Sequence, residues 1–168
     1  MSCDTVLPVD LVSMDHGLRI VVANVRGMNA RARRLNIKSL LDTTGASVVC
    51  FQETKVELLC SPIVLEALGS EFDEYVYLPA VGTRGGILLA WKSRIVTITD
   101  PSFSTNTISA KLTMGSGTPW WITVVYGPQA DADKIAFLQE LRDVRADCPG
   151  AVDAMWGLQP HIQGGGQE

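Results

Sequence analysis

The stretch Ala46-Ser47-Val48-Val49-Cys50-Phe51, followed by Gln52-Glu53-Thr54-Lys55, decides the fold class of this chain. Nearly all of the first six residues are apolar or small, and two are adjacent valines, which is typical of a strand buried on both faces. A carboxylate placed where such a strand leaves its sheet lies in the crevice where open α/β sheets bind ligands. Glu53 is therefore a candidate metal ligand.

The residues before this strand predict the rest of a β-α-β unit. Residues 18–23 form an apolar run that reads as a strand, and Asn24 and Gly27 end it in a turn. We expect Asn29 to cap a helix over about 30–42, because its side chain can accept a bond from the first helical turn. Two strands joined in this way are parallel, with a right-handed crossover.

Beyond residue 60 the pattern changes from helical to closely spaced strands. A short helix at 63–68 and a strand at 74–78 are expected first, and a helix capped by Asp131 or Asp133 is expected last. Between them, four short apolar runs predict an antiparallel meander: 85–91, 94–99, 107–113 and 119–126. The expected fold class is mixed α/β, with a β-α-β start followed by an antiparallel meander and a helix.

The composition excludes several classes of protein. Hydrophobic residues make up 46% and charged residues 19%, which is ordinary for a globular protein, and no apolar run reaches the about 18 residues that span a membrane. Residues 1–17 contain three aspartates and no lysine or arginine, unlike a signal or transit peptide, so we expect an intracellular protein, nuclear or cytosolic. The four cysteines lack C-x-x-C spacing, which argues against zinc and a disulfide framework.

Charge is distributed unevenly along the chain. The net charge of −4 argues against non-specific coating of nucleic acid, but residues 18–60 hold seven cations against three anions. A solvated helix face is the alternative reading for any one of these cations. The cations in this segment that could contact phosphates are Arg26, Arg31, Arg33, Arg34, Lys38 and Lys55.

Four phrases at strand ends resemble the endonuclease/exonuclease/phosphatase superfamily of metal-dependent phosphodiesterases. They are more similar still to the endonuclease domain of plant LINE-type (non-LTR) retrotransposons. The resemblance covers about residues 18–150, and four phrases in the same order are far more specific than any one alone. The phrases are Ala23-Asn24-Val25-Arg26-Gly27-Met28-Asn29, Cys50-Phe51-Gln52-Glu53-Thr54-Lys55, Gly85-Gly86-Ile87-Leu88-Leu89-Ala90-Trp91 and Val124-Val125-Tyr126-Gly127-Pro128-Gln129.

This resemblance implies a partial four-layer α/β sandwich and a catalytic set of Asn24, Glu53 and Tyr126. Glu53 and Asn24 would hold Mg²⁺, with Mn²⁺ as an alternative, because Mg²⁺ takes one or two carboxylates and completes its shell with water and phosphate. The Tyr126 hydroxyl could donate to a phosphate oxygen. The structural alternatives are an exposed strand-end acid for Glu53, a turn residue for Asn24 and a core aromatic for Tyr126. Arg26 replaces an aspartate of some superfamily members, which puts a second metal carboxylate in doubt.

The superfamily's water-activating residues have no match in this sequence. After the last helix the family carries a Gly-Asp-x-Asn motif, a further aspartate and an Asp-His pair, and the only histidines here are His16 and His161. Residues 151–162, written in suitable synonymous codons and read one nucleotide later, give Pro-Trp-Met-Leu-Cys-Gly-Asp-Phe-Asn-Leu-Ile. Met155 and Trp156 have no synonymous codons and force the Cys-Gly start of that motif. We therefore hypothesise a reading-frame slip near Gly150.

The expected organisation is a flexible lead (1–17), the N-terminal part of an endonuclease/exonuclease/phosphatase domain (18–150) and a non-homologous tail (151–168). The expected ancestral reaction is Mg²⁺-dependent nicking of DNA, with this chain inactive or severely impaired, its metal weakly bound, and no membrane or obligate protein partner. The alternatives are a non-catalytic remnant that binds nucleic acid through Arg31, Arg33, Arg34 and Lys38, and an unstable pseudogene product. A lipid-phosphate or small-molecule phosphatase is the alternative enzyme.

Overall fold

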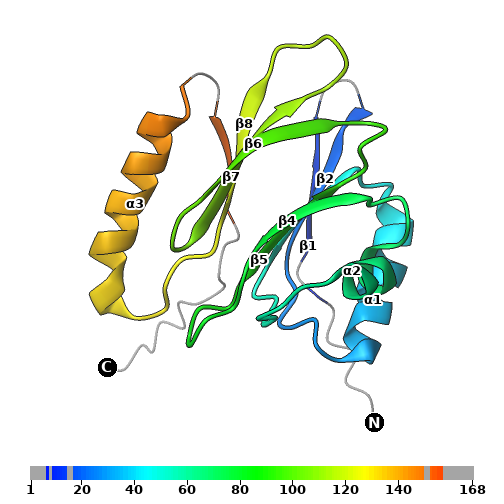
Figure 1. Cartoon of the computed structure of the whole chain (residues 1–168), viewed down its shortest axis with the longest axis horizontal. Helices are drawn as coiled ribbons and strands as arrows, with labels where there is room; N and C mark the ends of the chain where they lie inside the picture. Colours follow the sequence, from blue (N-terminus) through cyan, green and yellow to red (C-terminus); the bar gives the residue numbers. More distant parts are fainter. Residues whose placement is uncertain (1–6, 8, 15–16, 150–151, 157–168) are drawn as a thin grey trace, which may run out of the picture.

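Two β-sheets packed face to face, with helices outside each, form the computed structural model (Figure 1). It describes residues 7, 9–14, 17–149 and 152–156. The first sheet contains β1 (Val9–Ser13), β2 (Arg19–Asn24), β3 (Val48–Gln52), β4 (Glu74–Leu78) and β5 (Ile87–Trp91). The second contains β6 (Thr97–Phe103), β7 (Thr107–Thr113), β8 (Trp120–Val125) and β9 (Val152–Trp156). The helices are α1 (Arg31–Thr44), α2 (Ser61–Leu68) and α3 (Lys134–Asp147), with a 3-10 turn, η2 (Asp131–Asp133), before α3.

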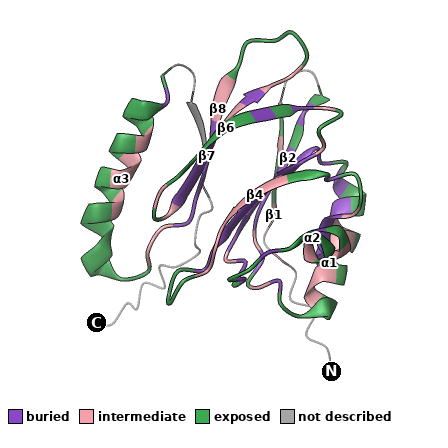
Figure 2. Ribbon diagram, in the orientation of Figure 1, coloured by how far each residue is buried: buried purple, intermediate pink, exposed green. Residues whose placement is uncertain are grey.

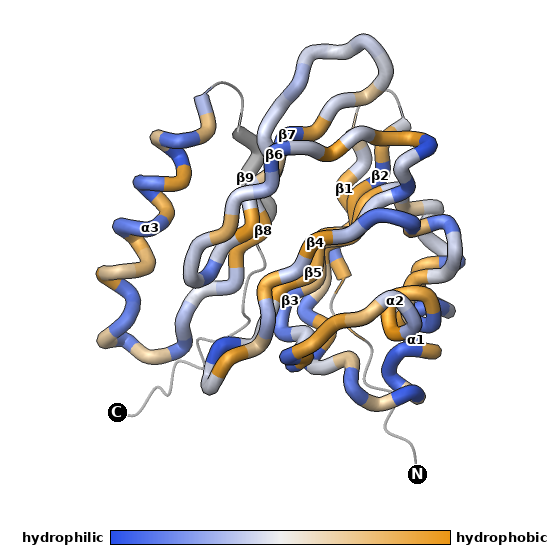
Figure 3. The backbone as a smooth tube through the Cα atoms, in the orientation of Figure 1, coloured by the Kyte–Doolittle hydropathy of each residue, from blue (hydrophilic) through white to orange (hydrophobic). Residues whose placement is uncertain are grey.

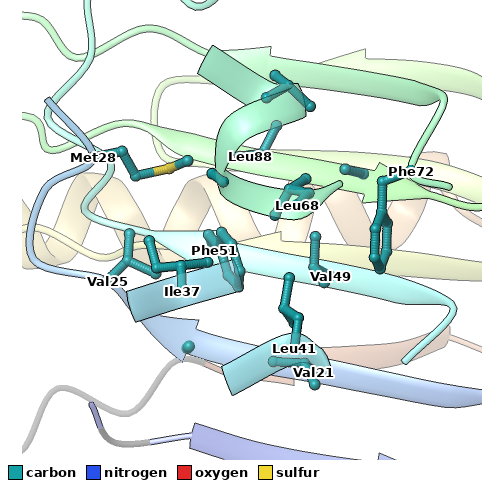
Figure 4. Packing of buried hydrophobic residues seen from close by; sticks show 14 of the residues in the cluster. Val21, Val25, Met28, Ile37, Leu41, Val49, Phe51, Leu68, Phe72 and Leu88 are labelled. Atoms are coloured by element: carbon teal, nitrogen blue, oxygen red, sulfur yellow. The ribbon is translucent and has the colours of Figure 1, made fainter. Parts of the chain in front are cut away.

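The first sheet has the order β1-β2-β3-β5-β4. Strands β2 and β3 are parallel and joined by α1, whereas the other neighbours are antiparallel. All residues of β3 and β5 are buried, because these strands lie inside the sheet and are covered on both faces. Helices α1 and α2 cover the outer face, where Ile37, Leu41 and Leu68 pack against Val49 and Phe51 (Figure 4).

The second sheet has the order β6-β7-β8-β9, antiparallel except for the parallel pair β8–β9. Its inner face shares a core with the first sheet, to which β7 contributes Ile108, Ala110 and Leu112. Its outer face meets α3, so the layers run helix, sheet, sheet, helix (Figure 1). Apolar colouring is concentrated along the sheets and on the α1–α2 side, while α3 carries mixed colours (Figure 3).

The expected mixed α/β class is confirmed, and the β-α-β start with it. The prediction that 85–91 opens a four-stranded meander is wrong, because β5 lies between β3 and β4 in the first sheet. The meander therefore comprises β6, β7 and β8 alone. A short apolar run identifies a strand but not its partner, which the packing of the two sheets selects.

Two local expectations also need correction. Ala30, and not Asn29, is the N-cap residue of α1, and the Asn29 side chain instead donates to the Lys55 carbonyl oxygen at 2.6 Å. Within the segment expected to be a flexible lead, Val9–Ser13 forms β1 and pairs with β2.

The expected non-homologous tail also contributes structure, since Val152–Trp156 forms β9 beside β8. The reading-frame slip concerns the nucleotide sequence and stays a hypothesis. His16 and His161 lie outside the described residues. Of the helices in the described part of the chain, none is both long and apolar enough to cross a membrane.

Candidate active site

Three strand ends bring Asn24, Glu53 and Tyr126 together. Asn24 ends β2 beside Gln52 of the parallel β3, so Glu53 follows at the same edge of the sheet. Tyr126 directly follows β8 of the second sheet. The buried Gln52 side chain crosses between the sheets, its Nε2 donating to the Val125 carbonyl oxygen at 3.2 Å. This bond fixes the position of Tyr126 relative to Glu53, because each residue is the direct neighbour of one bonded partner.

The backbone around Glu53 adopts a conformation that non-glycine residues rarely take. Arg26, Glu53 and Lys55 have φ angles of 51°, 55° and 55°, in the left-handed region. Each such residue costs on the order of 1 kcal/mol or more, and such residues cluster at functional sites. Backbone bonds from Gly27 N to Glu53 O (2.7 Å) and from Lys55 N to Gly85 O (2.6 Å) hold the segment in place.

Gly85 allows this segment to pack tightly. A Cβ atom at Gly85 would lie 2.9 Å from Cε1 of Tyr126 and 3.0 Å from Cα of Glu53. Both distances are shorter than ordinary carbon–carbon contacts, so a side chain here would push the two site residues apart. The glycine in the phrase Gly85-Gly86-Ile87 therefore has a direct steric role at the site.

The Glu53 carboxylate receives donors from three directions. Asn24 Nδ2 donates to its Oε2 at 3.0 Å, and the Tyr126 hydroxyl donates to the same oxygen at 3.3 Å. Lys55 Nζ lies 3.2 Å from Oε1. The backbone N–H of Arg26 donates to Asn24 Oδ1 at 3.1 Å, which orients the amide so that its nitrogen faces the carboxylate.

These donors determine the protonation state of Glu53. Burial alone would raise its pKa, but the hydrogen bonds from Asn24, Lys55 and Tyr126 and the positive charge of Lys55 outweigh that effect and lower the pKa below its ordinary value of 4.5. Glu53 is therefore an ionised carboxylate at neutral pH. Its side chain is 18% exposed, so one part of it faces solvent.

Glu53 faces a cleft with a volume of 420 Å³ that Lys55, Arg84 and Tyr126 also line. A second cleft of 920 Å³ lies between α3 and the second sheet. Arg84 and Tyr126 line both clefts. Sequence reasoning did not identify Arg84, although it directly precedes the phrase that begins at Gly85; the side-chain pattern gave no sign that this turn would reach Glu53.

Of the six cations that were expected to contact phosphates, Lys55 forms an ion pair with Glu53, whereas three cations of α1 pair with other acids. Arg31 and Arg34 both pair with Glu66 of α2, and Lys38 pairs with Asp42 within α1. The Arg34 guanidinium also donates to the carbonyl oxygen of Met28 at 2.9 Å. Arg26 contributes to the site through its backbone, Lys55 through its ammonium group, and Arg33 is half-buried on α1.

Two of the described residues that line the cleft carry carboxylates, Glu53 and Glu57, and Glu53 is the one that Asn24, Lys55 and Tyr126 hold in place. Within the part of the chain that the structure describes, no group of three or more His, Cys, Asp or Glu side chains could hold a metal. This rules out, for those residues, a closed cage of the structural zinc type. The donor set fits Mg²⁺, which binds through one or two carboxylates and takes its remaining ligands from water and phosphate. Glu53, ionised and facing the cleft, is the residue that would hold it.

Comparison with solved structures shows the same fold. The human nocturnin catalytic domain with a bound sulfate anion has a TM-score of 0.61 at 15% identity, covering 94% of this chain and 71% of that one. D. rerio TDP2 in complex with a single-strand DNA product gives 0.55 at 17%, covering 82% and 58%. The AP endonuclease LMAP from Leishmania major gives 0.53 at 14%, covering 77% and 47%. The chain thus spans about half the length of the latter two.

No curated protein sequence matches the chain. The family model described as Endonuclease/Exonuclease/phosphatase family matches residues 21–154, a span that includes Asn24, Glu53 and Tyr126. It also includes β9 as far as residue 154. Because the match covers most of the chain and the fold agrees, the chain belongs to the endonuclease/exonuclease/phosphatase family.

Proposed function

We propose that this chain is a nuclease-type member of its family, related to retrotransposon endonucleases, whose ancestral reaction is Mg²⁺-dependent hydrolysis of a DNA phosphodiester. The observation that carries the proposal is the ionised Glu53 carboxylate, which is bonded by Asn24 and Tyr126 and faces a cleft. An ionised carboxylate beside an open cleft suits a metal that completes its shell with substrate phosphate. The nuclear or cytosolic location expected from the sequence stays a prediction.

Each residue of the set has a distinct role in this proposal. Glu53 holds the ion, which when bound supplies polarisation of the phosphate and stabilisation of the leaving oxygen. Asn24 orients the Glu53 carboxylate without adding charge, because its amide is neutral, and its Oδ1 accepts the Arg26 N–H. The expected role of Asn24 as a second metal ligand stays a prediction. The Tyr126 hydroxyl lines the cleft and donates its one proton to Glu53 Oε2 at 3.3 Å. It would turn that proton to a phosphate oxygen that enters the cleft.

Two features support nucleic acid as the substrate class. The D. rerio TDP2 structure with this fold contains a single-strand DNA product, and a second relative in fold is an AP endonuclease. The phrases around Asn24, Glu53, Gly85 and Tyr126 resemble the retrotransposon branch and count against a lipid-phosphate or small-molecule phosphatase. A remnant that binds nucleic acid through α1 alone is less favoured, because three of its four cations, Arg31, Arg34 and Lys38, already pair with acids. Among the described residues Arg33 forms no ion pair.

We further propose that this chain hydrolyses DNA slowly or not at all. The sequence after α3 contains no Gly-Asp-x-Asn motif, whose asparagine and aspartate the resemblance assigns to the reacting half of the site. Loss of general-base assistance alone reduces a rate by roughly 10²–10⁴-fold. Residues 1–168 would then include those that hold the metal without the Gly-Asp-x-Asn residues of the reacting half.

Two measurements on the wild type, Glu53→Gln and Glu74→Gln test these proposals. Glu74, an exposed residue of β4, provides a matched loss of one carboxylate away from the cleft. In a titration of Mn²⁺ followed by electron paramagnetic resonance, we expect weak binding to the wild type and Glu74→Gln. We expect a loss of roughly tenfold or more in Glu53→Gln, since the carboxylate assigned to the ion is removed. Equal binding by Glu53→Gln and Glu74→Gln would contradict the assigned metal site.

In a plasmid-nicking assay with Mg²⁺ we expect little or no product from all three proteins. Robust nicking that Glu53→Gln abolishes would support the site and contradict the proposed impairment. Robust nicking that survives in Glu53→Gln would contradict both.

A further inference from the structure

Arg84 lies on a tight turn directly beside Glu53. Val81 and Arg84 exchange two backbone hydrogen bonds, N to O at 3.1 and 2.9 Å, around Gly82 with φ 57°. The next residue, Gly85, packs against Cα of Glu53 and accepts a 2.6 Å bond from Lys55 N. The Arg84 backbone is therefore held at a fixed place next to the carboxylate, while its side chain is exposed.

Arg84 differs from the other cation of the cleft in its ionic contacts. Lys55 Nζ is held 3.2 Å from Glu53 Oε1, so its charge is already opposed by an acid. Among the described residues Arg84 forms no ion pair. A chain with a net charge of −4 can bind a polyanion only where local positive charge is available, and in this cleft Arg84 is the cation without an acidic partner among those residues.

Arg84 also lies where the two clefts meet. The 420 Å³ cleft at Glu53 and the 920 Å³ cleft beneath α3 share Thr83, Arg84, Tyr126 and Gln129. A chain of phosphates that places one phosphate at Glu53 would therefore have its continuation beside Arg84. The planar guanidinium group can bind two phosphate oxygens at once, which a lysine ammonium group cannot do in the same geometry.

We infer that Arg84 is the residue of this site that binds the backbone phosphate flanking the one at Glu53. The inference rests on the proposed function, since it takes a nucleic acid as the ligand. It moves phosphate recognition from α1, where three of the four cations (Arg31, Arg34 and Lys38) pair with Glu66 or Asp42, to the turn between β4 and β5.

The test is binding of a fluorescent DNA duplex, followed by anisotropy over a range of salt concentrations. The proteins are the wild type, Arg84→Ala, Arg84→Lys and the control Arg142→Ala. Arg142 is an exposed arginine of α3 that lines neither cleft and forms no ion pair among the described residues. Both alanine variants lose one positive charge, so a difference between them depends on the position of that charge.

We expect Arg84→Ala to weaken binding roughly tenfold at low salt and to reduce the slope of log K against log salt by about 0.9, the value for one duplex phosphate contact. Arg84→Lys should keep the slope but bind less tightly than the wild type, because the charge remains and the two-pronged contact is lost. Arg142→Ala should match the wild type. Thermal unfolding of each variant should be unchanged, since both arginines are exposed.

Two outcomes would overturn the inference, and they are distinguishable. If the wild type binds DNA and Arg84→Ala behaves like Arg142→Ala, the phosphate contact lies elsewhere and the proposed function stands. If the wild type shows no salt-dependent DNA binding, the proposed nucleic-acid substrate and the role of Arg84 both fail.

Discussion

Helices α1 and α3 have the same length, 14 residues, but contribute to the fold in different ways. In α1, Ile37 and Leu41 are buried against the first sheet, whereas no residue of α3 is buried and Leu138 is 53% exposed. Figure 2 shows the contrast, with α3 largely exposed beside the second sheet. Two halves of the molecule can therefore be distinguished. Glu53 follows β3 of the first half, the first sheet with its closely packed helices α1 and α2. Tyr126 follows β8 of the second half, the second sheet with the mainly exposed helix α3.

This contrast explains how much each half depends on its helix. The first sheet has both faces covered, and its central strand β3 carries Glu53 at its end. The second sheet is held mainly by the core it shares with the first. Helix α3 is linked to it by the Glu140 carboxylate, which accepts bonds from Asn106 N at 2.7 Å and Asn106 Nδ2 at 2.9 Å. A few polar contacts give a helix less stability than a buried apolar face does.

The largest expected effect comes from matched leucines in the two helices. Leu41→Ala in α1 should lower the free energy of unfolding by about 2–5 kcal/mol, because it leaves a cavity in the core. Leu138→Ala in α3 should change it by less than about 0.5 kcal/mol, because that side chain is mainly exposed. Urea unfolding followed by circular dichroism measures both. Equal losses would show that α3 packs as firmly as α1.

An intermediate effect is expected where the two halves touch, at Gly85. Gly85→Ala places a Cβ against Tyr126 and the Glu53 backbone, which should destabilise the fold by about 1–3 kcal/mol and weaken Mn²⁺ binding. Gly115→Ala is the control, since an added Cβ there meets open space. Its only expected cost is the backbone strain of a non-glycine residue at a φ of 53°. It should cost about 1 kcal/mol and leave Mn²⁺ binding unchanged. Intact metal binding in Gly85→Ala would indicate that the two halves adjust independently.

The smallest expected effect is the dependence of stability on the ionisation of Glu53. Its pKa is lower in the folded chain than the ordinary value of 4.5, so its ionised form favours folding above that pH. This contribution should disappear as the pH falls through the folded-state pKa. Urea unfolding of the wild type and Glu53→Gln at several pH values should show a gap in stability that narrows below pH 4.5. A gap that widens on acidification would contradict the sign of the shift.

Local sequence patterns predicted the positions of helices and strands better than they predicted which strands pair in a sheet. The valine-rich run before Gln52 and the apolar run before Asn24 gave β3, β2 and the helix between them, because burial on both faces leaves a distinct composition. Because this strand ends at Gln52, the sequence also predicted that Glu53 lies at the crevice beyond the strand ends. The partner of β5 and the cap of α1 could not be read locally, since Asn29 is engaged by Lys55, 26 residues further along.

The sequence by itself determined the mixed α/β class, the position of Glu53 at a strand end and the family resemblance, because these depend on short-range patterns of apolarity and on motif phrases. The resemblance grouped Asn24 and Tyr126 with Glu53, but only the tertiary structure decided that both side chains donate to its carboxylate and that Arg84 joins them at the cleft. Tyr126 lies 73 residues from Glu53, and Arg84 reaches the cleft from a turn with no pattern of its own. Such contacts follow from the face-to-face packing of two sheets, which fixes distances between residues that no local periodicity relates.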